Sequence, residues 1–178
     1  MNKIVKLALI LFAFSAIMAA CPGGINLLTA ERIDAINAEK LAAAMEQVLP
    51  ADSYTEVEYK GNDTRIMNVY KAGNVGHTVK VAVGGSQGTI ELIVGVDADG
   101  AVSGISIVSH SETPGLGAVA AQANDKGQAF RDQFVGQSGT VSVTKDGGQI
   151  EALSGATVSS RAICDAATAA LEAVKTVG

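Results

Sequence analysis

The spacing of hydrophobic residues changes twice along the chain. An apolar run without any charge, LALILFAFSAIMAAC, covers residues 7–21 and follows two lysines. Residues 26–49 then repeat hydrophobic side chains at helical spacing. From residue 54 onward the period becomes two, which is typical of β-strands. The pattern therefore predicts an apolar N-terminal segment, a helix over residues 26–49 and a sheet-containing domain.

Five segments of this domain alternate hydrophobic and polar residues, with Gly, Asn and Asp between most of them. These three residue types favour tight turns, so neighbouring segments are expected to pair as hairpins. Strands with such short connections form a mainly antiparallel sheet. The expected strands cover residues 54–60, 65–71, 78–83, 89–96 and 102–108.

The second half of the domain favours helices, which makes the expected fold class α+β. Residues 118–134 have a helical pattern that is interrupted at Gly127, and residues 140–144 predict one short further strand. Residues 154–174 carry the clearest helical pattern, and Ser154 suits the N-cap. Its apolar stripe consists of Val158, Ile163, Ala166, Ala170 and Val174.

The N-terminal apolar segment has three interpretations. Residues 7–28 contain 22 residues, and at about 1.5 Å per residue they are long enough to cross a bilayer. This favours an uncleaved, single-pass anchor over residues 1–28, in the cell (inner) membrane, with the lysines cytoplasmic. A cleaved signal peptide and a lipoprotein signal acylated at Cys21 are the alternatives. In each case residues 29–50 form a connecting helix, and residues 51–178 form an extracytoplasmic (periplasmic) domain.

Charge and composition exclude several other functions. The net charge is −5, and no basic run follows the first two lysines, which argues against binding of nucleic acid. Cys21 and Cys164 stand in different contexts, and His77 and His110 are far apart in sequence. Neither pair has the spacing of a metal site or an iron–sulfur cluster. We therefore expect no metal and no metal-dependent catalysis.

A small-residue loop at 154–156 opens into the last expected helix. Free N–H groups and the positive dipole end make a helix start a suitable place for a phosphate. Gly155 and Ala156 allow a close backbone approach, and Thr157 offers a hydroxyl that can form a phosphoester. Arg161 follows one turn later and can reach the phosphate or a nearby carboxylate. On these residues alone, an ordinary helix cap with tight packing is the alternative.

The same residues carry a resemblance to a known family. The sequence SGAT at 154–157, followed by VSSRA, resembles the flavinylation motif of the FMN-binding domain family. Residues 110–117, HSETPGLG, look like the second signature of this family, and KDGG at 145–148 is similar to the turn that precedes the motif. The family includes the C subunit of the sodium-pumping NADH:quinone oxidoreductase and the G subunit of Rnf-type ion-translocating complexes. Residues 26–33 also resemble the Rnf G subunit.

The resemblance implies a specific cofactor and its attachment. FMN would be bonded through its phosphate to Thr157 by a separate flavin transferase, which uses FAD and magnesium and releases AMP. This chain has Glu151 where the family's motif usually begins with Asp. By position, the other residues expected at the cofactor are Ser154, Gly155, Ala156, Glu112, Thr113, Leu116 and Gly117.

The implied function is that of a redox subunit without catalytic residues of its own. The chain would transfer electrons within a membrane-bound, ion-translocating complex of the Rnf type, with the other subunits, the flavin transferase and the membrane as its partners. A stand-alone flavinylated carrier or lipoprotein outside the cytoplasm is one alternative. A binding module that keeps the fold without the flavin is another, and modification of Thr157 distinguishes it from the first two.

Overall fold

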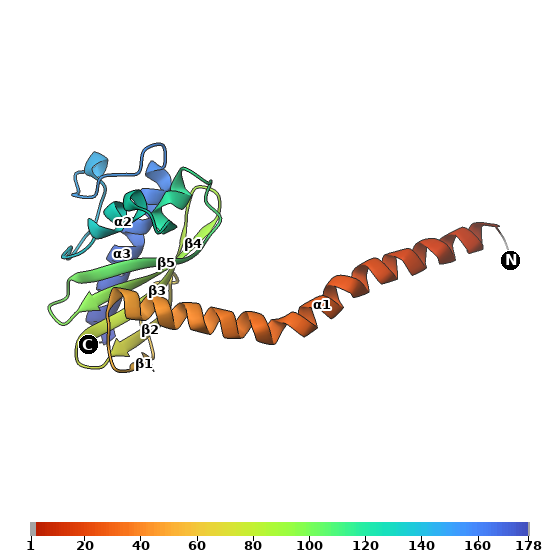
Figure 1. The fold of residues 1–178 in the computed structure, drawn as a ribbon, viewed down its shortest axis with the longest axis horizontal. Coiled ribbons are helices and arrows are strands. Elements are labelled where there is room, and N and C mark those ends of the chain that lie inside the picture. Colours follow the sequence, from red (N-terminus) through yellow and green to blue (C-terminus); the bar gives the residue numbers. More distant parts are fainter. Residues whose placement is uncertain (1–2, 178) are drawn as a thin grey trace. The chain divides into compact units, whose positions relative to one another are not determined.

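The computed structural model describes residues 3–177, except for the side chains of residues 17, 19–28, 31 and 34. The chain forms two compact units, Met1–Lys40 and Leu41–Gly178. The larger unit contains the sheet and the two sequence motifs (Figure 1).

Helix α1 is continuous from Lys3 to Val48, so the apolar run and the expected helix over residues 26–49 form one element. Apolar side chains of its first turns, such as Leu7 and Phe12, are exposed. Within the described part of the chain, no helix combines the length and the apolar character that a membrane crossing requires. The candidate acylation site Cys21 lies outside the described side chains, and the anchor over residues 1–28 stays a prediction.

The sheet confirms the antiparallel arrangement expected from the alternating segments. Five strands pair in the order β1-β2-β3-β4-β5, each antiparallel to the next. Each strand begins and ends close to its expected limits, although β1 ends at Val57 rather than at residue 60. The strands are β1 (Tyr54–Val57), β2 (Ile66–Ala72), β3 (Gly76–Gly84), β4 (Thr89–Asp97) and β5 (Val102–His110).

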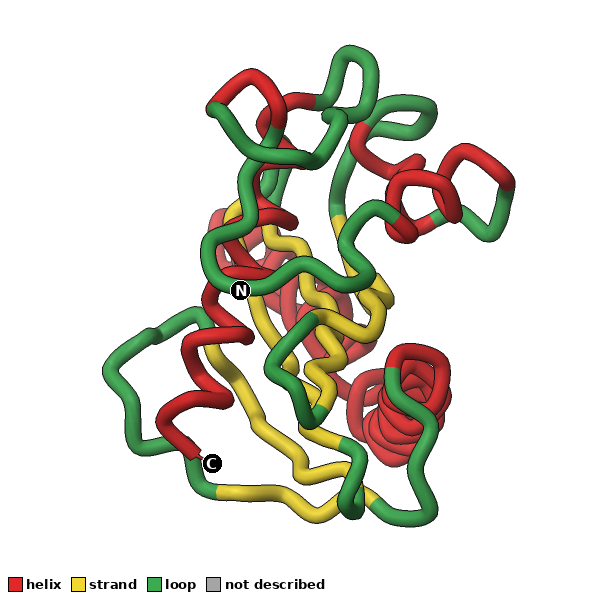
Figure 2. Tube along the Cα trace, turned by 90° about the vertical axis from the view of Figure 1, so that its left-hand side faces the viewer, coloured by secondary structure: helices red, strands yellow, loops and turns green. Residues whose placement is uncertain are grey.

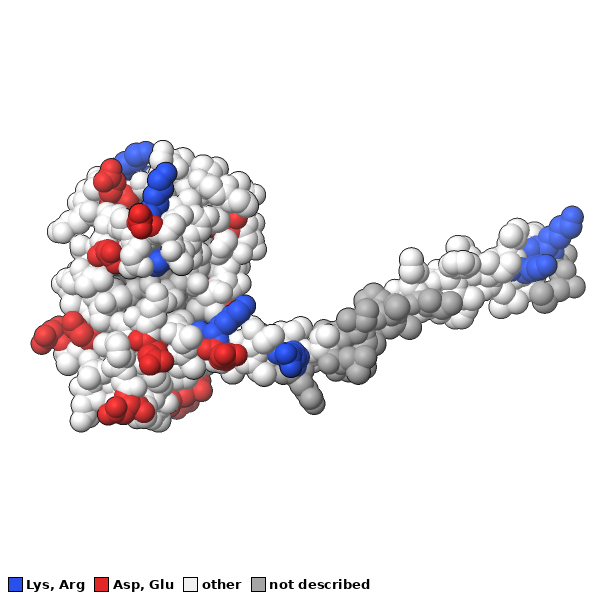
Figure 3. All heavy atoms as spheres, viewed as in Figure 1, with Lys and Arg blue, Asp and Glu red and all other residues white. Residues whose placement is uncertain are grey.

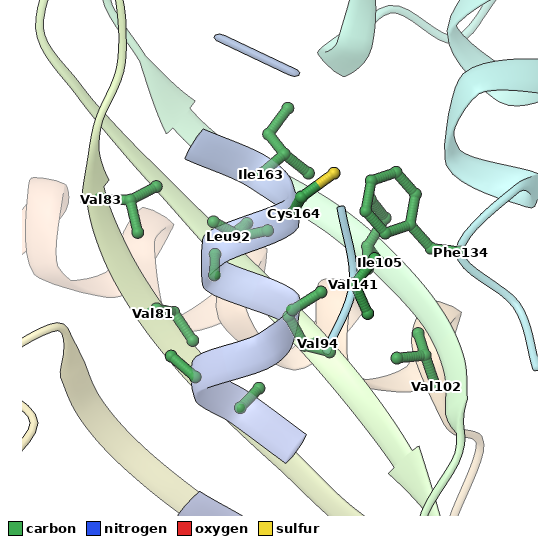
Figure 4. Packing of buried hydrophobic residues seen from close by; sticks show 14 of the residues in the cluster. Val81, Val83, Leu92, Val94, Val102, Ile105, Phe134, Val141, Ile163 and Cys164 are labelled. Carbon is green, nitrogen blue, oxygen red and sulfur yellow. The ribbon is translucent and has the colours of Figure 1, made fainter. Parts of the chain in front are cut away.

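Helix α3, Thr157–Val177, covers one face of this sheet. Figure 4 shows side chains of β3, β4 and β5 directed at it. Alanines on the helix face allow its backbone to approach the strands closely, and most of the expected stripe is buried. Val158 is an exception: it is 54% exposed, although its neighbours Ser159 and Ser160 are buried. The core joins Val81, Val83, Leu92, Val94, Ile105, Ile163, Ala166, Ala167 and Ala170.

The last turns of α1 cover the opposite face of the sheet (Figure 2). Gly95 and Gly104 lie opposite each other on β4 and β5. A methyl group at Gly95 would lie 2.8 Å from the carbonyl oxygen of Val48, and one at Gly104 would lie 3.2 Å from Val48 Cα. The Ser103 hydroxyl donates a 2.7 Å hydrogen bond to the same carbonyl oxygen. The two glycines therefore let the end of α1 rest directly on the strands.

The segment after β5 differs from the single interrupted helix that the pattern indicates. It contains two short helices, η1 (Gly117–Ala121) and α2 (Asp125–Asp132). The interruption falls between them, where Asn124 caps α2 by accepting a 2.9 Å hydrogen bond from Gly127 N. Gly127 lies inside α2, and a side chain there would overlap the carbonyl oxygen of Gln122. Gly127 therefore allows α2 to pack closely against the preceding loop, and it does not interrupt the helix.

The expected strand over residues 140–144 is wrong. Only an isolated bridge joins Val143 to Ile150, and a short helix, η2 (Thr144–Asp146), follows. The backbone of Val141 is bonded to the side chain of Thr168 on α3, at 3.0 Å, and not to an edge strand. Val141 and Val143 are nevertheless buried. The alternation of hydrophobic and polar residues in this segment therefore reflects burial of its valines against α3, and not strand pairing.

Thr78 on β3 has a hydroxyl that is fully buried and has no hydrogen-bond partner among the described residues. Thr78→Val keeps the shape and removes the unsatisfied hydroxyl, so we expect the free energy of unfolding to rise by about 1 kcal/mol. Urea denaturation measures this change. Thr78→Ser is the control, because it keeps the hydroxyl, loses a methyl group and should destabilise. A Val variant less stable than the wild type would contradict the prediction.

Candidate functional site

The two sequence motifs meet at one end of the domain, away from the C-terminus (Figures 1 and 2). One is the loop that follows β5, and the other is the segment that leads into α3. Gly155 has a φ of +72°, a left-handed conformation that favours glycine. A methyl group on Gly155 would lie 3.0 Å from Leu116 Cδ2. The structure thus brings Leu116 of the first motif against Gly155 of the second.

A tight turn precedes α3. The Ala156 N–H donates a 2.9 Å hydrogen bond to Leu153 O, and the positive φ of Gly155 at the third position is that of a type II turn. Helix α3 begins only at Thr157, so the expectation that Ser154 is the N-cap is wrong. Ser160 holds the turn instead, because its hydroxyl accepts from Leu153 N at 3.0 Å and donates to Ala156 O at 2.9 Å.

Thr157 is the first residue of α3 and is half-buried. Lys145 Nζ of η2 lies 3.5 Å from its hydroxyl oxygen. The neighbouring Asp146 forms a bidentate ion pair with Arg161. Arg161 Nε donates to Asp146 Oδ2 at 2.6 Å, and the terminal nitrogen Nη2 donates to Oδ1 at 2.7 Å. This confirms the carboxylate alternative for Arg161. The hydrogen bond from Arg161 lowers the pKa of Asp146 below its ordinary value.

A groove of about 660 Å³ lies between the motifs and α2. This volume is in the range of small-molecule sites. Gln133, which follows α2, fixes one wall, because its side-chain oxygen accepts a 2.6 Å hydrogen bond from Glu151 N. Both Leu116 and Ser154 border the groove, so each motif contributes a residue to its walls. The walls are formed by residues 115, 116 and 119, by residues 126, 129, 130 and 133, and by residues 151–154.

Glu112 is directed into the protein and is only 6% exposed. Its Oε1 accepts hydrogen bonds from Ser86 N at 2.8 Å and Gln87 N at 3.1 Å, and its Oε2 accepts from the Ser159 hydroxyl. Burial raises the pKa of this carboxyl, but the hydrogen bonds from Ser159, Gln87 and Ser86, together with the charge of His110, outweigh burial and hold the pKa below its ordinary value. Glu112 therefore connects the β3–β4 turn to the start of α3.

Two glycines make room for this buried carboxylate. A side chain at Gly117 would overlap both Glu112 Oε2 and the Ser159 hydroxyl, and one at Gly85 would overlap Glu112 Oε1. Packing within the protein therefore explains why Gly117 is a glycine. Contacts of Glu112 and Gly117 with a flavin stay predictions.

The remaining expected residues have distinct places. Thr113 is exposed, and its carbonyl oxygen accepts from the N–H groups of Leu116 and Ala118, at 3.1 and 3.3 Å. Ala156 is buried beneath the turn. The hydrophobic pattern did not indicate that Ser159 and Ser160 make structural hydrogen bonds, although two consecutive hydroxyls at the start of a helix are a usable signal.

Comparison with known proteins agrees with both motifs. Residues 85–172 match the model of the FMN-binding domain, and residues 1–48 match that of the RnfG N-terminal region. The first match includes both motifs and the groove.

Several curated relatives align over most of their length. The G subunit of the ion-translocating oxidoreductase complex of Methanosarcina acetivorans is 36% identical, over 97% of this chain and 95% of the relative. The G subunit of the Na⁺-translocating ferredoxin:NAD⁺ oxidoreductase complex of Acetobacterium woodii is 34% identical, over 89% and 85%. The corresponding G subunit of Pseudoalteromonas atlantica is 31% identical, over 92% and 84%. The chain therefore belongs to the family of G subunits of ion-translocating oxidoreductase complexes, and it contains that family's FMN-binding domain.

Proposed function

We propose that this chain is an electron-transfer subunit that carries FMN bonded covalently to Thr157. The observation that carries this proposal is the hydroxyl of the half-buried Thr157 at the start of α3, three residues beyond Ser154 on the groove wall. A nucleotide joined to this hydroxyl through its phosphate can lay its ring into the groove. The family membership of the chain supports the identity of the cofactor.

The residues present fit such a cofactor. FMN supplies the ability to exchange one or two electrons, so that it can connect carriers of different types. Thr157 provides the oxygen of the ester, and the turn at Gly155 lets the backbone come close to it. Leu116 offers the ring an apolar contact, and the Gln133–Glu151 hydrogen bonds keep the opposite wall in place. A covalent bond retains the cofactor outside the cytoplasm, where a lost flavin is not replaced.

We further propose that residues 1–28 anchor the chain in the cell membrane, with the domain on the extracytoplasmic side. Support comes from the exposed apolar side chains of α1, including Ile4, Leu11 and Phe14. Figure 3 shows basic atoms at the N-terminal end of this helix and uncharged ones over the described residues next to them. The relatives are named as subunits of ion-translocating complexes, and we propose the same membrane-bound assembly for this chain. An intact N-terminus on the membrane-extracted protein is expected, and an acylated Cys21 at a new N-terminus would contradict the anchor.

Mass spectrometry tests the covalent attachment. The full chain is produced together with an active flavin transferase, and we expect a mass increase equal to FMN less one water. Trypsin cuts after Lys145 and Arg161, so one peptide, residues 146–161, contains the whole motif, and its fragments should place the flavin on Thr157. A relative that is modified under the same conditions is the positive control. A bare polypeptide mass beside that control would exclude the proposal.

Leu116→Asp tests whether the groove holds the ring. Leu116 is 42% exposed, so the fold should tolerate the change. A carboxylate beside the ring disfavours electron uptake, and we expect the midpoint potential to fall by a few tens of millivolts. Redox titration followed by absorbance measures this shift. Leu116→Asn is the matched control without the charge, and equal potentials for the two variants would place the ring elsewhere.

A further inference from the structure

The turn that contains Lys145 is fixed in place against α3. Val143 and Ile150 at its base are fully buried, and the Thr144 N–H donates a 2.9 Å hydrogen bond to Ile150 O. Gly147 closes the turn with a left-handed φ of +84°, and its N–H donates to Thr144 O at 3.1 Å. The Asp146–Arg161 pair then ties the exposed side of the turn to the second turn of α3.

This arrangement separates the roles of the two cations near Thr157. Arg161 directs both its Nε and a terminal nitrogen at Asp146. Lys145, the residue before Asp146, places its ammonium group 3.5 Å from Thr157 Oγ1. Phosphate oxygens added at Oγ1 would lie within reach of the same ammonium group. A lysine ammonium is a compact point charge that commonly pairs with phosphate.

We propose that Lys145 is a positioning residue that pairs with the phosphate of the flavin nucleotide at Thr157, both during attachment and afterwards. The proposal rests on the proposed function. In the transfer, the Thr157 oxygen forms a bond to the FMN phosphorus, and the bond from that phosphorus to the bridging oxygen of FAD breaks. AMP leaves, and the hydroxyl proton passes to a base of the transferase. The phosphodiester that remains keeps one negative charge for Lys145 to balance.

Lys145→Gln tests this role in the full chain, in the presence of the transferase and limiting FAD. We expect the initial rate of flavin incorporation to fall roughly fivefold, a modest effect because the side chain is exposed. Lys145→Arg should retain most of the rate. Lys175→Gln, which removes the same charge at the far end of α3, is the matched control and should match the wild type. In-gel flavin fluorescence and intact mass follow the reaction, and equal melting temperatures show that the variants fold.

The ³¹P NMR signal of the completed phosphodiester supplies a second readout that the transferase does not affect. It should shift in the Lys145→Gln protein and stay unchanged in the Lys175→Gln protein. An unchanged signal would contradict pairing with the phosphate, and slower transfer with that result would assign Lys145 to recognition by the transferase. A wild-type rate and an unchanged signal together would remove Lys145 from the site. A wild-type chain that takes up no flavin would instead overturn the proposed function, and this inference with it.

Discussion

Replacing Thr157 by valine is expected to abolish covalent flavin completely while the domain stays folded. Valine has nearly the same shape and carries a methyl group in place of the hydroxyl that the phosphoester requires. Thr157 is half-buried at the first position of α3, so the free energy of unfolding should change by less than about 1 kcal/mol. Intact mass and the flavin fluorescence that survives acid precipitation measure the loss.

Two variants show whether this hydroxyl is the one modified. Ser154→Ala removes the hydroxyl that borders the groove and should leave the flavin attached. Thr157→Ser keeps an oxygen at the same place and should retain attachment, although at a different rate. If Thr157→Val carries the normal amount of acid-stable flavin, the ester lies elsewhere in the chain.

Replacing Glu112 by alanine is expected to be the most destabilising change at the site, by roughly 3–5 kcal/mol. It leaves the N–H groups of Ser86 and Gln87 and the hydroxyl of Ser159 without their acceptor, and it opens a cavity beneath Gly117. Chemical denaturation of the full chain measures this loss. Glu112→Gln is the control, because it keeps the volume and one acceptor oxygen, and it should cost about half as much or less. An alanine variant with wild-type stability would show that the buried carboxylate does not hold the loops together.

The same carboxylate gives the stability a dependence on pH. The pKa of Glu112 in the folded domain lies below its ordinary value of 4.5, so its contribution is fully present above that pH. It is lost as the pH falls through the lower folded pKa. The difference in stability between the wild type and Glu112→Gln should therefore be largest near neutral pH and shrink in acid. A difference that does not change with pH would contradict an ionised Glu112.

The sheet and the last helix were predictable because their signals are local. Alternating residues define each strand, and Ile163, Ala166 and Ala170 repeat at helical spacing on the buried face of α3. The motif resemblance also named Leu116 and Gly155, which the structure brings together, and Ser154, which borders the groove with Leu116. These features depend on residues that are close together in the chain or that recur as a recognisable string.

The features that the sequence did not reveal depend on contacts between distant residues. Glu112 and Ser159 are 47 positions apart, and nothing local indicates that this carboxylate is directed inward. The start of α3 at Thr157 instead of Ser154 depends on the turn that Ser160 holds. The segment at 140–144 alternates like a strand, but it lies against a helix. At the start of α3 and at residues 140–144, tertiary contacts overrode the local sequence preference.

Ser159 and Ser160 are neighbours on α3, but they bind different parts of the site. The Ser159 hydroxyl donates a hydrogen bond to Glu112, and the Ser160 hydroxyl is hydrogen-bonded to the turn before Thr157. The loop that contains Glu112 and the proposed attachment point are thus both held by the first turn of α3. If this first part of the helix moves, both follow it, and the spacing between them is preserved. A flavin attached as proposed would therefore keep its reach toward a docked electron carrier constant while the rest of the domain fluctuates.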